Sequence, residues 1–329
     1  MHLLKSYIKF LLKSQNQHGL HSPFVYELVT KCFYDKKFYP AYDLLKSFRR
    51  SLLKNDNFIK VTDFGAGSRV FKSEKRKISA VAKNAGISGK RARLLYRLVN
   101  YLECKNVLEL GTSLGIATSA IAANRDVKVL TLEGCPETAN IAQQQFEQFR
   151  LNNIQLKIGK FEETLEEVVE SGEWREESEK RKEKREERKK NRIQEAGDKK
   201  VESGEENPKK EKRKETKEQQ EAGDRRQETG EETNSELQTT NYKRKNYDLI
   251  FFDGNHQKQP TLAYFHKLLP GAKNSSVFIF DDIHWSPEME EAWEEIKDHP
   301  QVTVSIDTFY WGLIFFRKEQ AKQHFNIRL

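Results

Sequence analysis

Short apolar runs alternate with segments of helical periodicity from about residue 90 to the end of this 329-residue chain. We predict strands at 106–110, 127–132, 154–158, 247–252, 277–280, 302–306 and 312–316. Helices are predicted at 90–102, from 115, from 136, and over 161–170, 259–269 and 287–298. Such alternation restricts a chain to a mainly parallel sheet with helices on both faces.

The last two predicted strands depart from this alternation. Too few residues separate 302–306 from 312–316 for a helical crossover, so these strands must form an antiparallel hairpin. The predicted fold class is therefore α/β, with a Rossmann-like, doubly wound, seven-stranded sheet that ends in a C-terminal antiparallel hairpin. Residues 1–60 have a mostly helical pattern and add an N-terminal helical extension.

Composition divides the chain into three parts. Residues 173–246 hold 23 Lys/Arg and 21 Asp/Glu with almost no large apolar side chains. Such a stretch cannot bury enough apolar surface to offset the entropy cost of ordering it. We therefore predict an N-terminal helical, basic extension at 1–84, one cofactor-binding domain formed by 85–172 and 247–329, and a charged, low-complexity, disordered insert at 173–246.

Charge and cysteine content limit the partners and the compartment. Residues 1–100 carry 21 basic and 6 acidic side chains, which suits an anionic substrate, a nucleic acid or an acidic membrane surface, or simply a solvated face. Three widely spaced cysteines form no metal or disulfide pattern, which fits a cytoplasmic location. The sequence contains no run of about 18 apolar residues, so we predict no transmembrane segment in it. Residues 1–13 are expected to form an amphipathic helix, packed on the domain or touching a membrane surface as a peripheral contact. The oligomeric state stays open.

The first predicted strand runs into a glycine turn that can hold a nucleoside cofactor. Gly111 and Gly115 allow a tight turn, with Ser113 between them, and ligands of open α/β sheets bind at such strand ends. Glu133 follows the second strand, 22 residues after Gly111, where an acidic side chain accepts ribose hydroxyls. A negative Glu109 would repel the pyrophosphate of a nicotinamide dinucleotide and attract the ammonium group of a methionine. S-adenosylmethionine is therefore the favoured cofactor.

A second glycine-rich stretch, Asp63-Phe64-Gly65-Ala66-Gly67-Ser68, superficially repeats this turn. No strand–helix–strand unit of suitable length follows it, so a second nucleotide site is not expected there. We interpret it as a loop near the mouth of the active site.

Carboxylates gather at the ends of the fourth and fifth predicted strands. Asp253 ends the fourth strand, and Asp281 and Asp282 end the fifth. Three oxygen donors suit a hard cation such as Mg²⁺, which can hold and acidify a substrate hydroxyl. His256 or His284 could then take the proton. In the alternative interpretation these carboxylates cap a helix or contact the cofactor or the backbone, without a metal.

These motifs resemble those of the class I S-adenosylmethionine-dependent methyltransferases. Within that class they are most similar to the metal-dependent O-methyltransferases that act on catechols, caffeoyl-coenzyme A and sugars. The resemblance covers about residues 85–170 and 245–318. It implies cofactor contacts from Glu109, Gly111, Ser113, Gly115, Glu133, Gly159, Lys160, Phe161 and Asp253, and metal ligands at Asp253, Asp281 and Asp282.

The resemblance also implies roles for residues where this chain departs from the family. Ala117 stands in place of a cofactor-contacting serine, so Thr118 is expected to substitute for it. The catechol-type enzymes have a lysine as base where this chain has His256. In the sugar-modifying relatives a pattern like Asp281-Asp282-Ile283-His284 supplies both metal ligands and the base, which slightly favours His284 over His256 as the catalytic base.

The sequence therefore predicts an enzyme that methylates an oxygen of a small hydroxylated acceptor with the help of a divalent metal. Two other functions remain open. A nucleic-acid methyltransferase would use the basic N-terminal region, although the chain lacks an NPPY-like tetrapeptide for methylating base amino groups. A non-catalytic binding protein would retain the fold without the chemistry.

Overall fold

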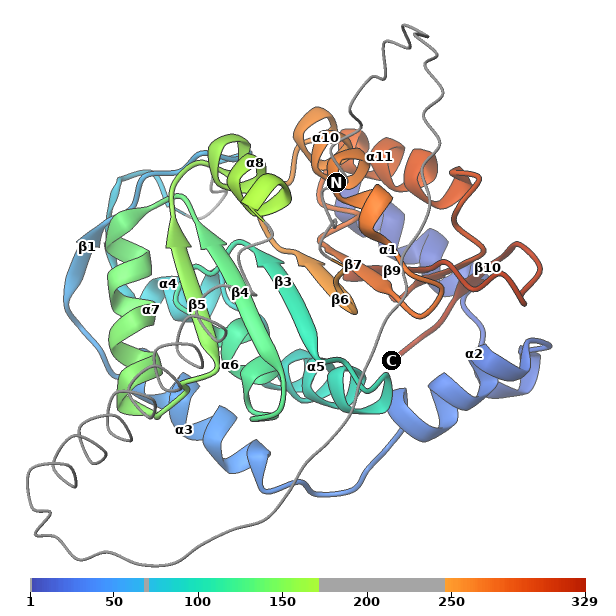
Figure 1. Cartoon of the computed structure of the whole chain (residues 1–329), viewed down its shortest axis with the longest axis horizontal. Helices are drawn as coiled ribbons and strands as arrows, with labels where there is room; N and C mark the ends of the chain where they lie inside the picture. Colours follow the sequence, from blue (N-terminus) through green and yellow to red (C-terminus); the bar gives the residue numbers. More distant parts are fainter. Residues whose placement is uncertain (1, 68–70, 172–245) are drawn as a thin grey trace, which may run out of the picture. The chain divides into compact units, whose positions relative to one another are not determined.

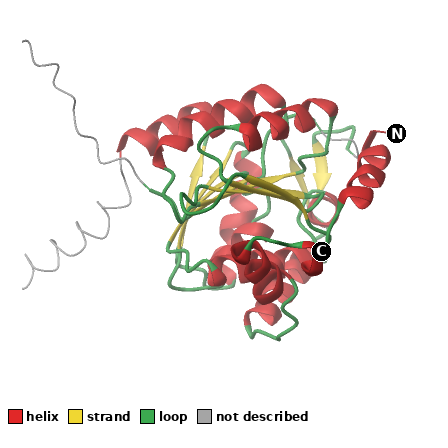
Figure 2. Cartoon of the chain, turned by 90° about the vertical axis from the view of Figure 1, so that its right-hand side faces the viewer, coloured by secondary structure: helices red, strands yellow, loops and turns green. Residues whose placement is uncertain are grey.

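A twisted sheet lies between two layers of helices in the computed structural model, which describes residues 2–67, 71–171 and 246–329 (Figures 1 and 2). The predicted insert at 173–246 falls, except for Asn246, outside the described residues. No helix within the described ranges is long and apolar enough to cross a membrane.

Helices make up most of the first hundred residues and the connections between strands. The helices are α1 (His2–Lys13), α2 (Pro23–Leu28), α3 (Ala41–Leu53), α4 (Ile78–Asn84), α5 (Gly89–Tyr101), α6 (Ile116–Ala122), α7 (Pro136–Gln148), α8 (Phe161–Ser171), α10 (Lys258–Leu268) and α11 (Pro287–Asp298). Single-turn segments occur at η1 (Gln17–Gly19), η2 (Val29–Phe33) and η3 (Leu269–Gly271). Sequence signals fix several starts: the hydroxyls of Ser88 and Ser286 accept N–H groups at the first turns of α5 and α11, and proline opens α7 and α11.

The main sheet has eight strands in the order β10-β8-β9-β7-β6-β3-β4-β5. Its strands are β3 (Asn106–Leu110), β4 (Lys128–Glu133), β5 (Ile154–Ile158), β6 (Leu249–Phe252), β7 (Val277–Asp281), β8 (Val304–Asp307), β9 (Trp311–Phe315) and β10 (Gln323–Asn326). Strand β9 is antiparallel to both β7 and β8, and the other pairs are parallel. A separate antiparallel pair joins β1 (Phe58–Lys60) to β2 (Lys75–Lys77).

The predicted count of seven strands is wrong by one, because β10 extends the sheet beyond β8. Strand β10 reads Gln-His-Phe-Asn and lacks the apolar run by which the other strands are recognised. Its backbone nevertheless pairs in parallel with the whole of β8. Strand β10 therefore covers an edge that would otherwise carry unpaired N–H and C=O groups.

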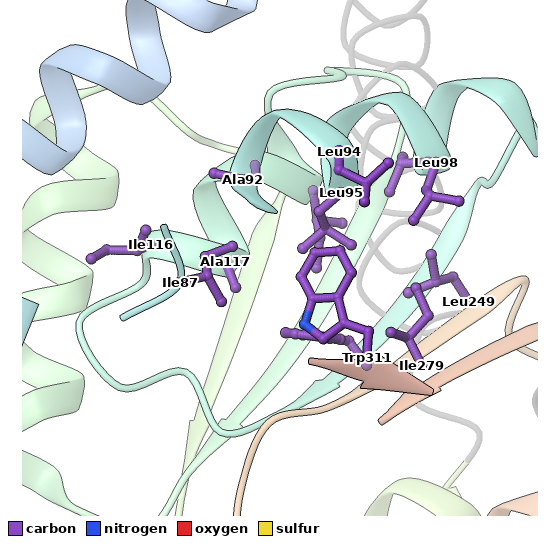
Figure 3. Close-up of a cluster of buried hydrophobic side chains, with 14 of the residues drawn as sticks. Ile87, Ala92, Leu94, Leu95, Leu98, Ile116, Ala117, Leu249, Ile279 and Trp311 are labelled. Atoms are coloured by element: carbon purple, nitrogen blue, oxygen red, sulfur yellow. The ribbon is translucent and has the colours of Figure 1, made fainter. Parts of the chain in front are cut away.

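The central strands are apolar throughout because helices cover both faces of the sheet. On one face, Trp311 of β9 packs beneath Leu94, Leu95 and Leu98 of α5, and Ile279 lies beside it (Figure 3). On the other face, the ring centroid of Phe280 lies 6.2 Å from that of Phe265 in α10 and 6.5 Å from that of Trp293 in α11. This two-sided burial explains why β6 and β7 read as continuous apolar runs and not as alternating ones.

Helix α1 packs on the same body through a narrow face. Phe10 is buried, and its ring centroid lies 5.6 Å from that of Phe309. Leu4, Ile8 and Leu12 on the outer side are 64%, 51% and 82% exposed. Residues 1–13 were predicted to form an amphipathic helix that packs on the domain or touches a membrane surface. The structure has the packed helix, and membrane contact stays a prediction.

Candidate functional site

The carboxyl ends of β3, β4, β6 and β7 surround a cavity of about 510 Å³. The predicted site residues that line it are Gly111, Ser113, Glu133, Lys160, Phe161, Asp253, His256, Asp281 and Asp282. The predicted site residues outside its lining are Glu109, Gly115, Thr118, Gly159 and His284. Parallel strands bring their ends to one edge of the sheet, which is why residues 170 positions apart in the sequence meet here.

Glu133 is held at the end of β4 by two backbone groups. Its Oε2 accepts the N–H of Ser113 at 2.6 Å, and its Oε1 accepts the N–H of Cys135 at 2.9 Å. Burial raises the pKa of Glu133, while these backbone hydrogen bonds oppose the rise. The carboxylate is therefore held in a fixed position where it lines the cavity.

Glu109 and Thr118 form a buried network and not the ligand contacts that the sequence predicts. Both residues are fully buried, and Glu109 Oε2 accepts the hydroxyls of Thr118 at 2.5 Å and Thr131 at 2.6 Å. Burial raises the pKa of Glu109 to about 7, against the opposing effect of the two hydroxyls. The network joins β3, α6 and β4 behind the cavity, so its role here is to fix these elements.

Gly115 and Gly159 also depart from their predicted role as cofactor contacts. Gly115 has φ +78°, and a Cβ there would lie 2.5 Å from Cε1 of Phe146. A Cβ on Gly159 would lie 2.8 Å from Cγ2 of Thr164. Both glycines are required by close packing at the starts of α6 and α8, and neither faces the cavity.

One wall of the cavity comes from the segment before α4, which was interpreted as a loop at the mouth. Residues 61–67 line the cavity, so that interpretation is confirmed for the described part of the loop. The N–H of Ala66 donates to the carbonyl of Asn255 at 3.2 Å, and a Cβ on Gly134 would lie 2.8 Å from the Phe64 ring. The loop thus touches the tips of both β4 and β6, and Phe64 lies beside the residue that follows Glu133. Nothing in the periodicity of the sequence marks Phe64 as a site residue.

Asp253, Asp281 and Asp282 form an acidic cluster on the cavity wall, and the sequence did not predict that an arginine side chain would lie among them. Nη1 of Arg91, from the first turn of α5, donates to Oδ1 of Asp281 at 2.9 Å, and the two side chains are 22% and 7% exposed. Burial and the neighbouring carboxylates of Asp281 and Asp282 raise the pKa of Asp253 well above its ordinary value. The Asp253 carboxyl therefore holds its proton more readily than an ordinary aspartate does.

The three carboxylates do not form the predicted metal site. Within 2–67, 71–171 and 246–329, no three Asp, Glu, His or Cys side chains are arranged to hold a metal ion. Asp281 uses one oxygen on Arg91, and Asp282 has a left-handed backbone, with φ +54°, fixed by its N–H donating to the carbonyl of Tyr310. This donor set does not fit a divalent cation.

The two candidate histidines lie in different places. His256 lines the cavity, with its Nε2 3.9 Å from Oδ1 of Asp253. His284 lies outside the cavity lining, where its Nδ1 is 2.7 Å from Oε1 of Glu290 and its Nε2 is 2.9 Å from Oδ2 of Asp307. A ring that donates from both nitrogens has no lone pair left to accept a proton. This geometry does not support the predicted preference for His284 as the base, and His256 is the candidate that lines the cavity.

Glu290 and Asp307 hold the His284 ring from both sides, an arrangement we call the imidazolium clamp. It makes the stability of the fold depend on pH. Burial disfavours the charged ring, but hydrogen bonds and charge from Asp307 and Glu290 outweigh it and raise the pKa of His284. A raised pKa in the folded state gives stability that is complete below the unfolded pKa of about 6.5 and is lost as pH rises through the folded value. We expect His284→Gln to lower the free energy of unfolding strongly at pH 6 and much less at pH 9, measured by urea denaturation.

His299→Gln is a matched control for this titration. Burial lowers the pKa of His299, so its contribution changes with pH in the opposite direction. The difference between the wild type and His299→Gln should not shrink as pH rises. A constant difference between the wild type and His284→Gln from pH 6 to pH 9 would contradict the imidazolium clamp.

Two family models match parts of the chain. A model described as "O-methyltransferase" matches residues 70–178, and one described as "Methyltransferase domain" matches residues 189–283. A catechol O-methyltransferase of Niastella koreensis is 33% identical over 89 residues, which are 26% of this chain and 40% of that protein. The chain therefore matches less than half the length of this relative.

Solved structures of methyltransferases also align with the chain at low identity. A Podospora anserina methyltransferase bound to S-adenosylhomocysteine has a TM-score of 0.47 at 12% identity, covering 90% of this chain and 97% of its own. The O-methyltransferase TomG of Streptomyces achromogenes, in complex with S-adenosylmethionine, has a TM-score of 0.45 at 13% identity, covering 92% and 99%.

The sequence matches confirm the resemblance that the motifs around β3 and β4 predicted. The chain is similar to the class I S-adenosylmethionine-dependent methyltransferases. Within that class it is similar to the O-methyltransferases, with a catechol O-methyltransferase among the relatives.

Proposed function

We propose that this chain transfers a methyl group from S-adenosylmethionine to a hydroxyl oxygen of a small acceptor. The observation that carries the proposal is the position of Glu133: a carboxylate fixed by two backbone N–H groups at the mouth of the β3–β4 crevice. That is where an open α/β sheet binds the ribose of a nucleoside. The similarity of residues 70–178 to the O-methyltransferase family supports the same reaction class.

The lining of the cavity offers hydrogen-bond partners for both ends of a sulfonium nucleoside. Glu133 would accept the ribose hydroxyls, and Gly111 and Ser113 would bring backbone close to the methionine end. Asp253 also lines the cavity, where its carboxyl group can accept a hydrogen bond from the ammonium group of the methionine end.

Methyl transfer requires an acceptor oxygen that is in line with the sulfonium methyl and free of its proton. The cofactor supplies the methyl group on a positively charged sulfur. His256 would take the hydroxyl proton, while the oxygen forms the new C–O bond and the electron pair of the breaking S–C bond stays on sulfur. Phe64 and the rest of the 61–67 wall would exclude water and hold the acceptor in line.

The predicted assistance by Mg²⁺ has no place in this mechanism. The carboxylates at the β6 and β7 tips do not fit a divalent cation, because Asp281 is already paired with the guanidinium of Arg91. We therefore derive no step through a metal.

Glu133→Ala tests the cofactor part of the proposal. The variant should bind S-adenosylmethionine more weakly by about 1–3 kcal/mol, because two ribose hydroxyls and the N–H groups of Ser113 and Cys135 lose their acceptor. Isothermal titration calorimetry with purified full-length protein measures this directly.

Glu147→Gln is the matched control, because Glu147 lies on the exposed side of α7, where its carboxylate accepts a hydrogen bond from the side chain of Gln143. It should bind the cofactor as the wild type does. If wild-type protein gives no binding heat with S-adenosylmethionine over a range of temperatures, the proposal fails.

A further inference from the structure

We propose that the guanidinium of Arg91 takes the place of the divalent cation in this site, as a built-in positive charge that makes the methyl transfer independent of metal. The inference deepens the proposed function and rests on it for its catalytic meaning. Its structural content, that Arg91 keeps cations out of the acidic cluster, can be tested without any reaction.

The position of Arg91 is fixed from three sides. Its backbone N–H donates to the Ser88 hydroxyl at the start of α5, which sets the direction in which the side chain leaves the helix. Nη1 then reaches Oδ1 of Asp281 at the tip of β7. Cζ lies 5.0 Å from the ring centroid of Tyr310, so the flat guanidinium also has a favourable aromatic neighbour.

This arrangement gives the acidic cluster the positive charge that a bound metal cation would otherwise provide. Arg91 lines the cavity together with Asp253, Asp281 and Asp282, and it is mostly shielded from solvent. A guanidinium stays protonated under all ordinary conditions and carries five N–H donors. One donor is used on Asp281, which leaves others for an acceptor oxygen as its negative charge develops.

The same contact explains why the donor set is unsuited to Mg²⁺. A hard cation needs oxygen ligands that are free to converge on it. The negative charge of the Asp281 carboxylate is already balanced by Arg91 at 2.9 Å. A second positive charge placed beside Arg91 would be repelled. Removing the guanidinium while leaving the three carboxylates should therefore create a cation site where the wild type has none.

The experiment is a Mn²⁺ titration of full-length protein followed by electron paramagnetic resonance. Wild-type protein should bind no Mn²⁺ below about 1 mM, whereas Arg91→Gln should bind it at least about tenfold more tightly, through the freed Asp281 and its neighbours. Arg93→Gln is the matched control: Arg93 lies two residues away on α5, is exposed, and donates to the carbonyl of Gly89. It should behave as the wild type does.

Micromolar Mn²⁺ binding by the wild type, or no gain of binding in a folded Arg91→Gln variant, would overturn the proposal. Because loss of the ion pair can destabilise the fold, thermal unfolding of each variant is recorded first, and the wild-type titration decides the question if Arg91→Gln does not fold. Turnover should be the same within about twofold in EDTA and in Mg²⁺. Absence of S-adenosylmethionine binding in the same samples would count against the proposed function and leave the Mn²⁺ result standing.

Discussion

His256→Gln is expected to lower kcat about 10²–10⁴-fold, the contribution typical of a positioned general base, while cofactor affinity stays within about twofold of the wild type. His256 is the one histidine among the described residues that line the cavity. Asn255 and His256 both have positive φ, at +69° and +27°, so the loop after β6 is held in a strained form that aims His256 at the cavity. Single-turnover kinetics with a hydroxylated acceptor separate this loss from any change in cofactor binding.

His284→Gln distinguishes the two histidines that the sequence left open. His284 is clamped between Glu290 and Asp307, outside the cavity lining, so its loss should affect stability and not proton transfer. Measured well below its unfolding temperature, this variant should retain most of the wild-type kcat. If His284→Gln loses turnover as severely as His256→Gln does, the assignment of the base is wrong.

The alternation of apolar runs and helices was enough to predict the main elements of the fold. Each predicted strand from 106 onward is present within about two residues of its predicted ends, because two-sided burial demands a continuous apolar run. Strand β10 escaped prediction because its stability comes from backbone pairing with β8 and not from its side chains. Polar edge strands carry no comparable signal.

The sequence predicted a cavity-lining residue correctly only where its place at the end of a strand determines that its side chain faces the cavity. Glu133 is the last residue of β4 and Asp253 directly follows β6, and both line the cavity as expected. Glu109 lies inside β3, and sequence does not tell which face of a fully buried strand a side chain occupies; it meets Thr118 of α6 instead. The sequence also does not show that His284 is held by Glu290 and Asp307 outside the cavity lining.

Arg91 was missed for a different reason. It lies 190 residues before Asp281 in the sequence, on a helix that carries two other arginines, so charge alone does not single it out. Only the docking of α5 beside the tip of β7 brings the guanidinium into the acidic cluster. Long-range pairs of this kind depend on tertiary packing, which local patterns do not encode.

Gly111→Ala is expected to destabilise the fold by about 2–4 kcal/mol and to abolish cofactor binding, because the site and the sheet meet at this residue. Gly111 has φ +104°, and a Cβ there would lie 2.1 Å from the carbonyl oxygen of Asp253. Its N–H also donates to the carbonyl of Leu132 at 2.9 Å, so the backbone cannot simply move away. The tips of β3 and β6 would have to separate, and Ser113 and Asp253 would shift with them.

Urea denaturation and cofactor titration of the same preparation measure both effects. Gly89→Ala is the matched control, since a Cβ at Gly89 meets nothing within 4 Å and its φ lies outside the left-handed region. At that first helical position alanine should leave stability unchanged or raise it by up to about 1 kcal/mol. If Gly111→Ala unfolds within about 0.5 kcal/mol of the wild type, the close approach of β3 to β6 does not exist in solution, and the cavity between them cannot have the shape on which the proposed chemistry depends.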